Sequence, residues 1–122
     1  MNGPNYLTPY SFTTFEGGIS GAAALAVDTV GNLYVADKTD CTIQRITPGG
    51  IVTTLAGSSG VKGSADGVGS SATFNTPEGI AVDSGGTVYV ADTGNSTIRM
   101  ITGAGIVSTL AGTCLLYTSR CV

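Results

Sequence analysis

The sequence predicts an all-β fold made of two repeated four-stranded antiparallel sheets and one additional strand. Two observations support this prediction: a strong internal repeat, and short apolar segments separated by turns rich in glycine and aspartate. The composition agrees, because 42% of the 122 residues are apolar, 11% are charged and 19 are glycine. Such a composition is typical of a globular chain and not of a disordered polymer.

The repeat consists of two stretches that lie 55 positions apart. Residues 26–57 and 81–112 share 19 identities in 32 aligned positions without a gap. Both copies contain Ala-Val-Asp and Tyr-Val-Ala-Asp, and both end in Thr-Leu-Ala-Gly. A match of this extent indicates two copies of one structural unit.

A third, partial copy precedes them. Residues 11–17 match the closing segment of each full repeat, at a spacing of 40 from Ile51. The unit is therefore about 40 residues long, and the second copy carries a longer loop. We divide the chain into an outer strand of a preceding or ring-closing unit with a linker (1–18), a first repeat (19–57), a long loop (58–73), a second repeat (74–113) and a tail (114–122).

Each repeat contains four short segments with the composition of β-strands. We expect strands over residues 25–27, 33–36, 42–46 and 51–55, and over 80–82, 88–91, 97–101 and 106–110. Segment 33–36 is apolar without alternation, which indicates a strand that is covered on both faces. Four-stranded units of about 40 residues with two buried faces describe the blades of a β-propeller.

Aspartates and glycines at the strand ends recur at identical repeat positions. An aspartate carboxylate can accept hydrogen bonds from backbone N–H groups two residues on, and glycine tolerates positive φ. We therefore expect structural turn roles for Asp28, Asp37, Asp83, Asp92, Gly31 and Gly86. The alternative is that carboxylates from several blades converge on a metal such as Ca²⁺, which needs six to eight oxygen ligands.

Residues 77–112 resemble the NHL repeat family, with Pro-x-Gly-Ile-Ala-Val-Asp, Tyr-Val-Ala-Asp and Asn-x-x-Ile-Arg. The first repeat departs from this pattern and has Asp40 in place of asparagine and Gln44 in place of arginine. The resemblance implies rings of about six blades that serve as platforms for proteins, glycans or other ligands. It also implies that only a minority of relatives are enzymes, and it suggests a secreted or cell-envelope location in bacteria.

The tail from Cys114 to Val122 continues no pattern upstream and resembles a translated sequencing adapter. We exclude it from fold reasoning and expect the chain to be truncated, since two blades and one strand do not close a ring. Cys41 is then the single cysteine of the natural part, and we expect it to be a small turn or packing residue.

Charge and composition argue against several classes of partner. The net charge is −3 and no basic cluster exists, so nucleic acid is not an expected partner. No apolar run is long enough for a membrane helix. There is no histidine, which removes the usual general base and the commonest zinc ligand, and we expect no cofactor.

The long loop is the candidate ligand-contacting segment, because long loops on rigid scaffolds often carry binding. Its candidate residues are Lys62, Asp66 and Phe74, although a plain interblade connection with Phe74 between the blades is the leading interpretation. Residues 67–72 satisfy a loose dinucleotide-binding spelling, but such a site requires a strand before it and a helix after it, and neither is predicted around Gly69. Arg99 is expected to be a solvated or blade-bridging charge, and Tyr34 and Tyr89 to be core residues.

Three functions remain open at this point. The leading hypothesis is a non-catalytic binding or scaffolding module that binds an unknown protein or glycan and self-associates through open blade faces. The second is part of a propeller hydrolase or lyase whose catalytic residues lie on other blades. The third is a repeat segment of a large bacterial surface protein.

Overall fold

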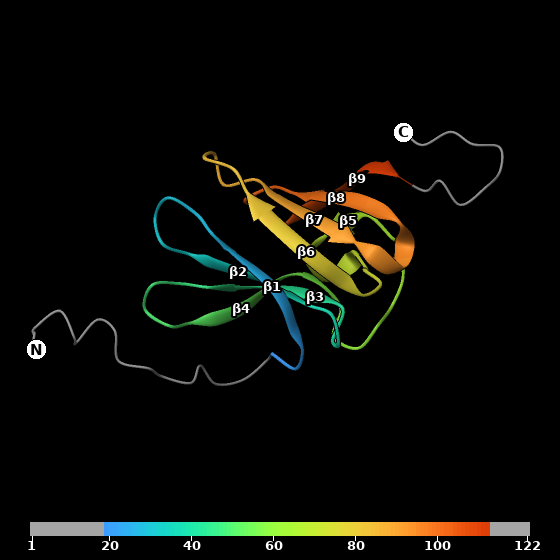
Figure 1. The fold of residues 1–122 in the computed structure, drawn as a ribbon, viewed down its shortest axis with the longest axis horizontal. Coiled ribbons are helices and arrows are strands. Elements are labelled where there is room, and N and C mark those ends of the chain that lie inside the picture. Colours follow the sequence, from blue (N-terminus) through green and yellow to red (C-terminus); the bar gives the residue numbers. More distant parts are fainter. Residues whose placement is uncertain (1–18, 113–122) are drawn as a thin grey trace, which may run out of the picture.

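The computed structural model describes residues 19–112, which form two antiparallel sheets packed side by side (Figure 1). The first sheet has the order β1-β2-β3-β4 and consists of β1 (Ala22–Val27), β2 (Leu33–Asp37), β3 (Thr42–Ile46) and β4 (Val52–Gly57). The second has the order β5-β9-β8-β7-β6 and consists of β5 (Gly67–Val68), β6 (Pro77–Val82), β7 (Val88–Asp92), β8 (Thr97–Ile101) and β9 (Ile106–Gly112). We call these sheets blade 1 and blade 2. The expected outer strand before residue 19 and the tail lie outside the described residues.

The first main strand of each blade, β1 or β6, begins earlier than the sequence predicts. β1 begins at Ala22 instead of residue 25, and β6 begins at Pro77 instead of residue 80. Each contains a register shift in its pairing with the next strand, between Ala22 and Ala24 and between Pro77 and Gly79. Proline is tolerated in β6 because β6 is an edge strand and Pro77 is its first residue.

The long loop contains regular structure that the sequence does not predict. Residues Gly67–Val68 form β5, which pairs with β9 through Val68 and Ile106, and residues Gly69–Ser71 form the 3₁₀ helix η2. Blade 2 therefore has five strands where four were expected. The expectation of an irregular segment around Gly69 is wrong, because the loop folds back along the outer edge of its own blade.

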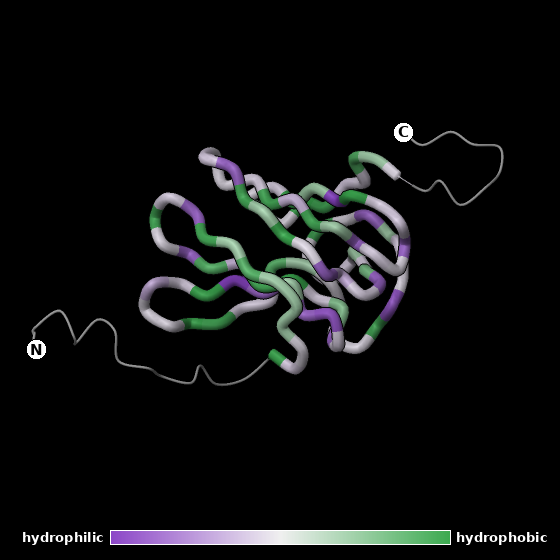
Figure 2. The backbone as a smooth tube through the Cα atoms, in the orientation of Figure 1, coloured by the Kyte–Doolittle hydropathy of each residue, from purple (hydrophilic) through white to green (hydrophobic). Residues whose placement is uncertain are grey.

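The hydrophobic core lies between the two blades. One cluster joins Tyr34, Ala36 and Ile43 of blade 1 to Val88, Val90 and Ile101 of blade 2. The β6 strand lies against β1 and β2, and η2 lies against β4 (Figure 1). Along the tube in Figure 2, short hydrophobic and hydrophilic stretches alternate in both blades.

The two blades differ in how their central strands are covered. All but the first residue of β2 are buried, which agrees with the prediction of a strand covered on both faces. In β7, buried and half-buried residues alternate. The prediction drawn from blade 1 therefore does not transfer to blade 2, where one face of the sheet is more open.

Candidate functional site

Asp28 and Asp83 lie at equivalent hairpin turns and bind the turn backbone. Asp28 Oδ1 accepts hydrogen bonds from the backbone N–H of Val30 at 3.0 Å and of Asn32 at 2.9 Å. Asp83 Oδ1 accepts from Gly85 and Thr87, both at 2.9 Å. Both turns place a glycine at positive φ, 97° for Gly31 and 88° for Gly86. These hydrogen bonds stabilise the two turns, and glycine allows the positive φ that each turn requires.

A tyrosine of the following strand also binds each hairpin aspartate. The hydroxyl of Tyr34 donates to Asp28 at 3.0 Å, and that of Tyr89 donates to Asp83 at 3.3 Å. The side-chain amide of Asn32, with further donors, lowers the pKa of Asp28 to about 2. The backbone N–H of Thr87 is the largest cause of the lowered pKa of Asp83. Burial, followed by the bond to Asp28, raises the pKa of Tyr34.

Asp37 and Asp92 are fully buried and bind segments well beyond their own turns. Asp37 accepts from the backbone N–H of Ser20 at 2.8 Å and of Gly21 at 2.9 Å. Asp92 accepts from the backbone N–H of Asn75 at 2.8 Å and from the Asn95 amide at 2.6 Å. Each carboxylate thus joins the end of one strand to the residues that enter its blade.

Arg99 is the centre of a buried polar cluster in blade 2. Its side chain is 1% exposed, and Nη1 donates to Asp92 at 2.9 Å and to the Thr73 carbonyl at 2.9 Å. Nη2 donates to the Ala65 carbonyl at 2.7 Å and to Asp66 at 3.0 Å. Of the two expected roles, solvated or blade-bridging, the solvated one is wrong, because the side chain is buried. Arg99 instead holds the long loop against blade 2 through these hydrogen bonds.

The three loop residues singled out from the sequence have different surroundings. Phe74 is fully buried in the interblade core, and the Arg99 guanidinium lies 4.8 Å from its ring centroid. Asp66 is half exposed and binds both Arg99 and the Thr109 hydroxyl. Lys62 pairs with Phe74 through an isolated backbone bridge, and the residue is exposed. Only Asp66 and Lys62 therefore present polar atoms to solvent.

Asn95-Ser96-Thr97 has the pattern of an N-glycosylation acceptor, and its asparagine belongs to this polar cluster. The Asn95 amide donates to the Gly63 carbonyl at 2.8 Å as well as to Asp92. Ser96 has φ 57°, the same left-handed conformation as Cys41 (φ 61°) at the equivalent position of blade 1. Cys41 is buried and is a free cysteine. These residues shape the turn before the third strand of each blade.

Sequence reasoning did not place Arg99 among the site residues, although one signal was available. Thr97, Arg99 and Ile101 share one face of β8 by strand alternation, and all three are buried. An arginine on the same strand face as an interior isoleucine predicts a buried cation, and such a cation requires a carboxylate partner. The recurring Asp92 is that partner.

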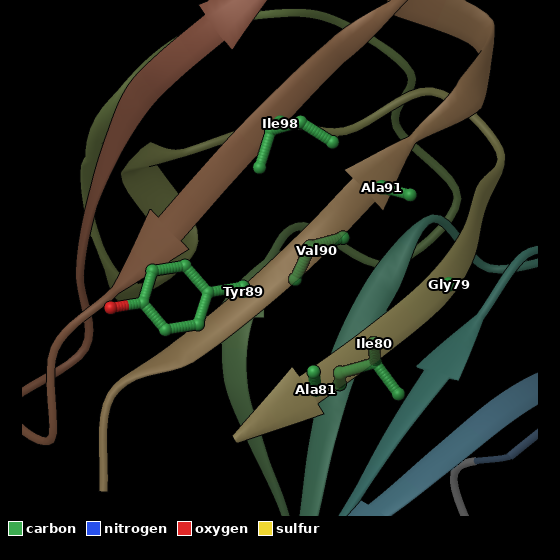
Figure 3. Close-up of a pocket in the computed structure, with 7 residues that line it drawn as sticks. All are labelled: Gly79, Ile80, Ala81, Tyr89, Val90, Ala91 and Ile98. Atoms are coloured by element: carbon green, nitrogen blue, oxygen red, sulfur yellow. The ribbon is translucent and has the colours of Figure 1, made fainter. Parts of the chain in front are cut away.

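An apolar depression of about 230 Å³ lies on the open face of blade 2 (Figure 3). Its lining contains no charged side chain and consists of Gly79, Ile80, Ala81, Tyr89, Val90, Ala91 and Ile98. Ile98 is 39% exposed. A hollow of this chemistry suits an apolar side chain, and the one ionisable group of its lining, the Tyr89 hydroxyl, is hydrogen-bonded to Asp83.

Two further features of residues 19–112 bear on chemistry and location. Within this range, no three His, Cys, Asp or Glu side chains are grouped so that they could hold a metal ion. No helix of the same range is long and apolar enough to cross a membrane.

Comparisons with known proteins agree with the observed blades. Residues 74–99 match the NHL repeat family. Human Teneurin-4 is 39% identical over 97 residues, a match that covers 68% of this chain and 4% of Teneurin-4. An auxiliary nutrient binding protein from Bacteroides thetaiotaomicron is similar with a TM-score of 0.57 and 26% identity, over 66% of this chain and 23% of that protein.

Virginiamycin B lyase from Staphylococcus aureus is similar with a TM-score of 0.55 and 17% identity, over 73% of this chain and 26% of the lyase. At that identity the likeness shows the fold alone, which is a β-propeller. The chain spans about a quarter or less of each of these proteins. Residues 74–99 of the chain are an NHL repeat, and the chain folds as part of a β-propeller.

Proposed function

We propose that this chain is a non-catalytic binding or scaffolding module whose ligand is a protein or a glycan. One observation supports the proposal above all: the buried charged side chains bind the protein's own backbone. Asp37, Asp92 and Arg99 are each at most 1% exposed and hydrogen-bonded to chain segments of their own blade. Groups committed in this way hold a rigid platform and are not available to bind or activate a substrate.

Ligand contact in the long loop is proposed for its exposed part. Lys62 and Asp66 offer a cation and a carboxylate at the surface, whereas Phe74 supports the loop from below. The two charges suit hydrogen bonding to glycan hydroxyls or to a peptide, because both are solvated donors or acceptors on a fixed loop. Self-association through open blade faces belongs to the same proposal.

Two other functions remain proposals for a longer protein. A hydrolase or lyase would need its acid, base or metal ligands on other blades, since the described residues contain no histidine and no metal-holding group. A repeat segment of a bacterial surface protein is compatible with a secreted or cell-envelope location. The similarity to an auxiliary nutrient binding protein supports a binding role.

The proposal is tested with the purified 122-residue chain on an array of immobilised neutral and acidic glycans, together with a turnover assay on virginiamycin B. We expect the chain to bind a subset of the glycans. We expect mass spectrometry to detect no conversion of virginiamycin B. Lys62→Ala should weaken glycan binding. Lys38→Ala should not, because Lys38 is exposed as well but lies in blade 1, away from the long loop. Turnover of virginiamycin B would contradict the non-catalytic assignment, and equal binding by both variants would contradict the loop assignment.

A further inference from the structure

Asp66-Gly67 is the one place in the sequence where a glycine follows an aspartate. At such a dipeptide the backbone nitrogen of the glycine reaches Cγ of the aspartate more readily than elsewhere, because no side chain of the following residue shields it. The other five aspartates precede larger residues, which are two threonines, a lysine, a cysteine and a serine. The long loop therefore contains the aspartate of this chain that is most prone to isomerise.

The structure requires a glycine at position 67. Gly67 has φ 152° and begins β5, where it pairs with Val107. A Cβ added at this position would lie 3.0 Å from Cβ of Ser71, closer than such atoms normally approach. A residue whose side chain shielded the nitrogen would therefore be strained here, both by its backbone angle and by Ser71.

The structure also uses the carboxylate at position 66. Oδ1 of Asp66 accepts hydrogen bonds from Arg99 Nη2 at 3.0 Å and from the Thr109 hydroxyl at 2.9 Å. The bond from the guanidinium is charge-assisted, which is the stronger kind. Both bonds hold the side chain in one orientation, while its 48% exposure leaves the carboxyl group within reach of water. Separate structural needs thus place an aspartate and a glycine next to each other.

We propose that Asp66 is a modification site, which isomerises spontaneously to isoaspartate when β5 detaches from β9 and the bonds to Oδ1 open, and that isoaspartate releases the long loop. The Gly67 nitrogen forms a bond to Cγ of the protonated carboxyl group, and its hydrogen leaves with the Cγ hydroxyl as water. The product is a five-membered succinimide, which water then hydrolyses. Cleavage at Cγ returns aspartate, whereas cleavage at the main-chain carbonyl carbon leaves isoaspartate. Local opening of a short strand is the step that controls the rate.

Isomerisation changes the segment that Arg99 holds. The main chain of isoaspartate runs through Cβ and Cγ, so it is one atom longer before the nitrogen of Gly67, and the free carboxylate moves to Cα. Arg99 and Thr109 then lose the acceptor at its present position, and β5 loses its register with β9. The inference is independent of glycan binding, because the reaction needs only atoms of this chain and water.

The experiment follows isoaspartate in the full 122-residue chain during incubation at constant pH and temperature. The probe is protein isoaspartyl methyltransferase with a labelled methyl donor, and tandem mass spectrometry assigns each label to a residue. Thr109→Val removes one donor to Asp66. Thr54→Val is the matched control, because Thr54 is an exposed threonine at the same repeat position of blade 1 and its hydroxyl binds Gln44 instead. The chain in concentrated urea gives the rate without structure, and circular dichroism verifies that each variant is folded.

We expect the label to accumulate at Asp66 faster than at any other aspartate, and more slowly in the folded wild type than in urea. Thr109→Val should accelerate it about threefold or more, since a hydrogen bond to the carboxylate is lost, whereas Thr54→Val should match the wild type. Arg99→Gln should accelerate it further, and if that variant does not fold, the two threonine variants decide. The isomerised chain should show faster hydrogen exchange over residues 58–74.

Four results would overturn the proposal. They are equal rates in the two threonine variants, a folded wild type that reacts as fast as the chain in urea, a label that accumulates mainly at another aspartate, and an isomerised chain whose long loop keeps its protection from exchange.

Discussion

Blade 1 and blade 2 have nearly the same strands but different polar interiors. At one repeat position blade 1 has Gln44 and blade 2 has Arg99, and both side chains are buried. Gln44 donates to the Thr42 hydroxyl at 2.9 Å and accepts from the Thr54 hydroxyl at 3.0 Å, so these bonds stay within β3 and β4. Arg99 reaches instead to the long loop, at residues 65, 66 and 73.

The residue at this position determines which segment the blade binds through its interior. In blade 2, Thr109 is the equivalent of Thr54, and its hydroxyl binds the loop residue Asp66 at 2.9 Å. Thr97 is the equivalent of Thr42, and its hydroxyl is buried without a hydrogen-bond partner among the described residues. Blade 2 thus holds the loop while two buried polar atoms, the Thr97 hydroxyl and Arg99 Nε, have no hydrogen-bond partner among the described residues.

The largest effect is expected from converting blade 2 to the blade 1 residue. Arg99→Gln removes the cation that pairs with the buried Asp92, and an uncompensated buried charge costs about 3–5 kcal/mol. Urea unfolding should therefore show a loss of that size. Gln44→Ala, which removes the hydrogen bonds to the Thr42 and Thr54 hydroxyls, should cost about 1–3 kcal/mol. Equal losses for the two variants would contradict the difference between the blades.

A second prediction addresses what the blades share. Gly31→Ala and Gly86→Ala each place a side chain at positive φ, where L-residues lose about 1–2 kcal/mol. An added Cβ would meet no atom closer than 3.4 Å at Gly31 and none within 4 Å at Gly86. The two losses in unfolding free energy should therefore be equal within error. A much larger loss at one turn would show that the hairpins are not equivalent.

The paired threonines should respond with opposite signs. Thr42→Val removes a hydroxyl that binds both Gln44 and Asp40, which should destabilise the protein by about 1 kcal/mol. Thr97→Val removes the hydroxyl without a partner, so it should be neutral or stabilising. Thermal unfolding of both variants is the measurement. A destabilised Thr97→Val would mean that this hydroxyl has a partner in solution.

The smallest expected effect is the acid dependence of the hairpins. The pKa of Asp28 falls from 3.8 to about 2 on folding, so its contribution to stability is complete above pH 3.8 and is lost as the pH falls through about 2. Asp28→Asn should flatten the decline of unfolding free energy over this range. Asp83→Asn should do the same to a smaller extent, because Asp83 lacks the side-chain amide that Asn32 supplies. An unchanged slope in Asp28→Asn would contradict the hydrogen-bond assignment.

The repeat made the fold predictable, but it did not predict the tertiary role of individual polar residues. Spacing and turn chemistry placed the four main strands of each blade and the hairpin glycines, because these depend on local backbone geometry. The bonds of Asp37 to Ser20 and of Arg99 to Ala65 join residues far apart in sequence, and no local pattern specifies such partners. Strand β5 was missed because its two residues pair with residues of β9, which follow much later in the sequence.

The central claim is that Arg99 holds the long loop to blade 2 as a structural tie. Hydrogen exchange of the wild type and Arg99→Gln tests it most directly, read over residues 58–74 and over residues 33–46. Gly63 donates to the Phe74 carbonyl and Thr73 to the Ala65 carbonyl, so both amides should be protected in the wild type. Arg99→Gln should exchange much faster over 58–74 while blade 1 keeps its protection. Unchanged protection of the loop would contradict it.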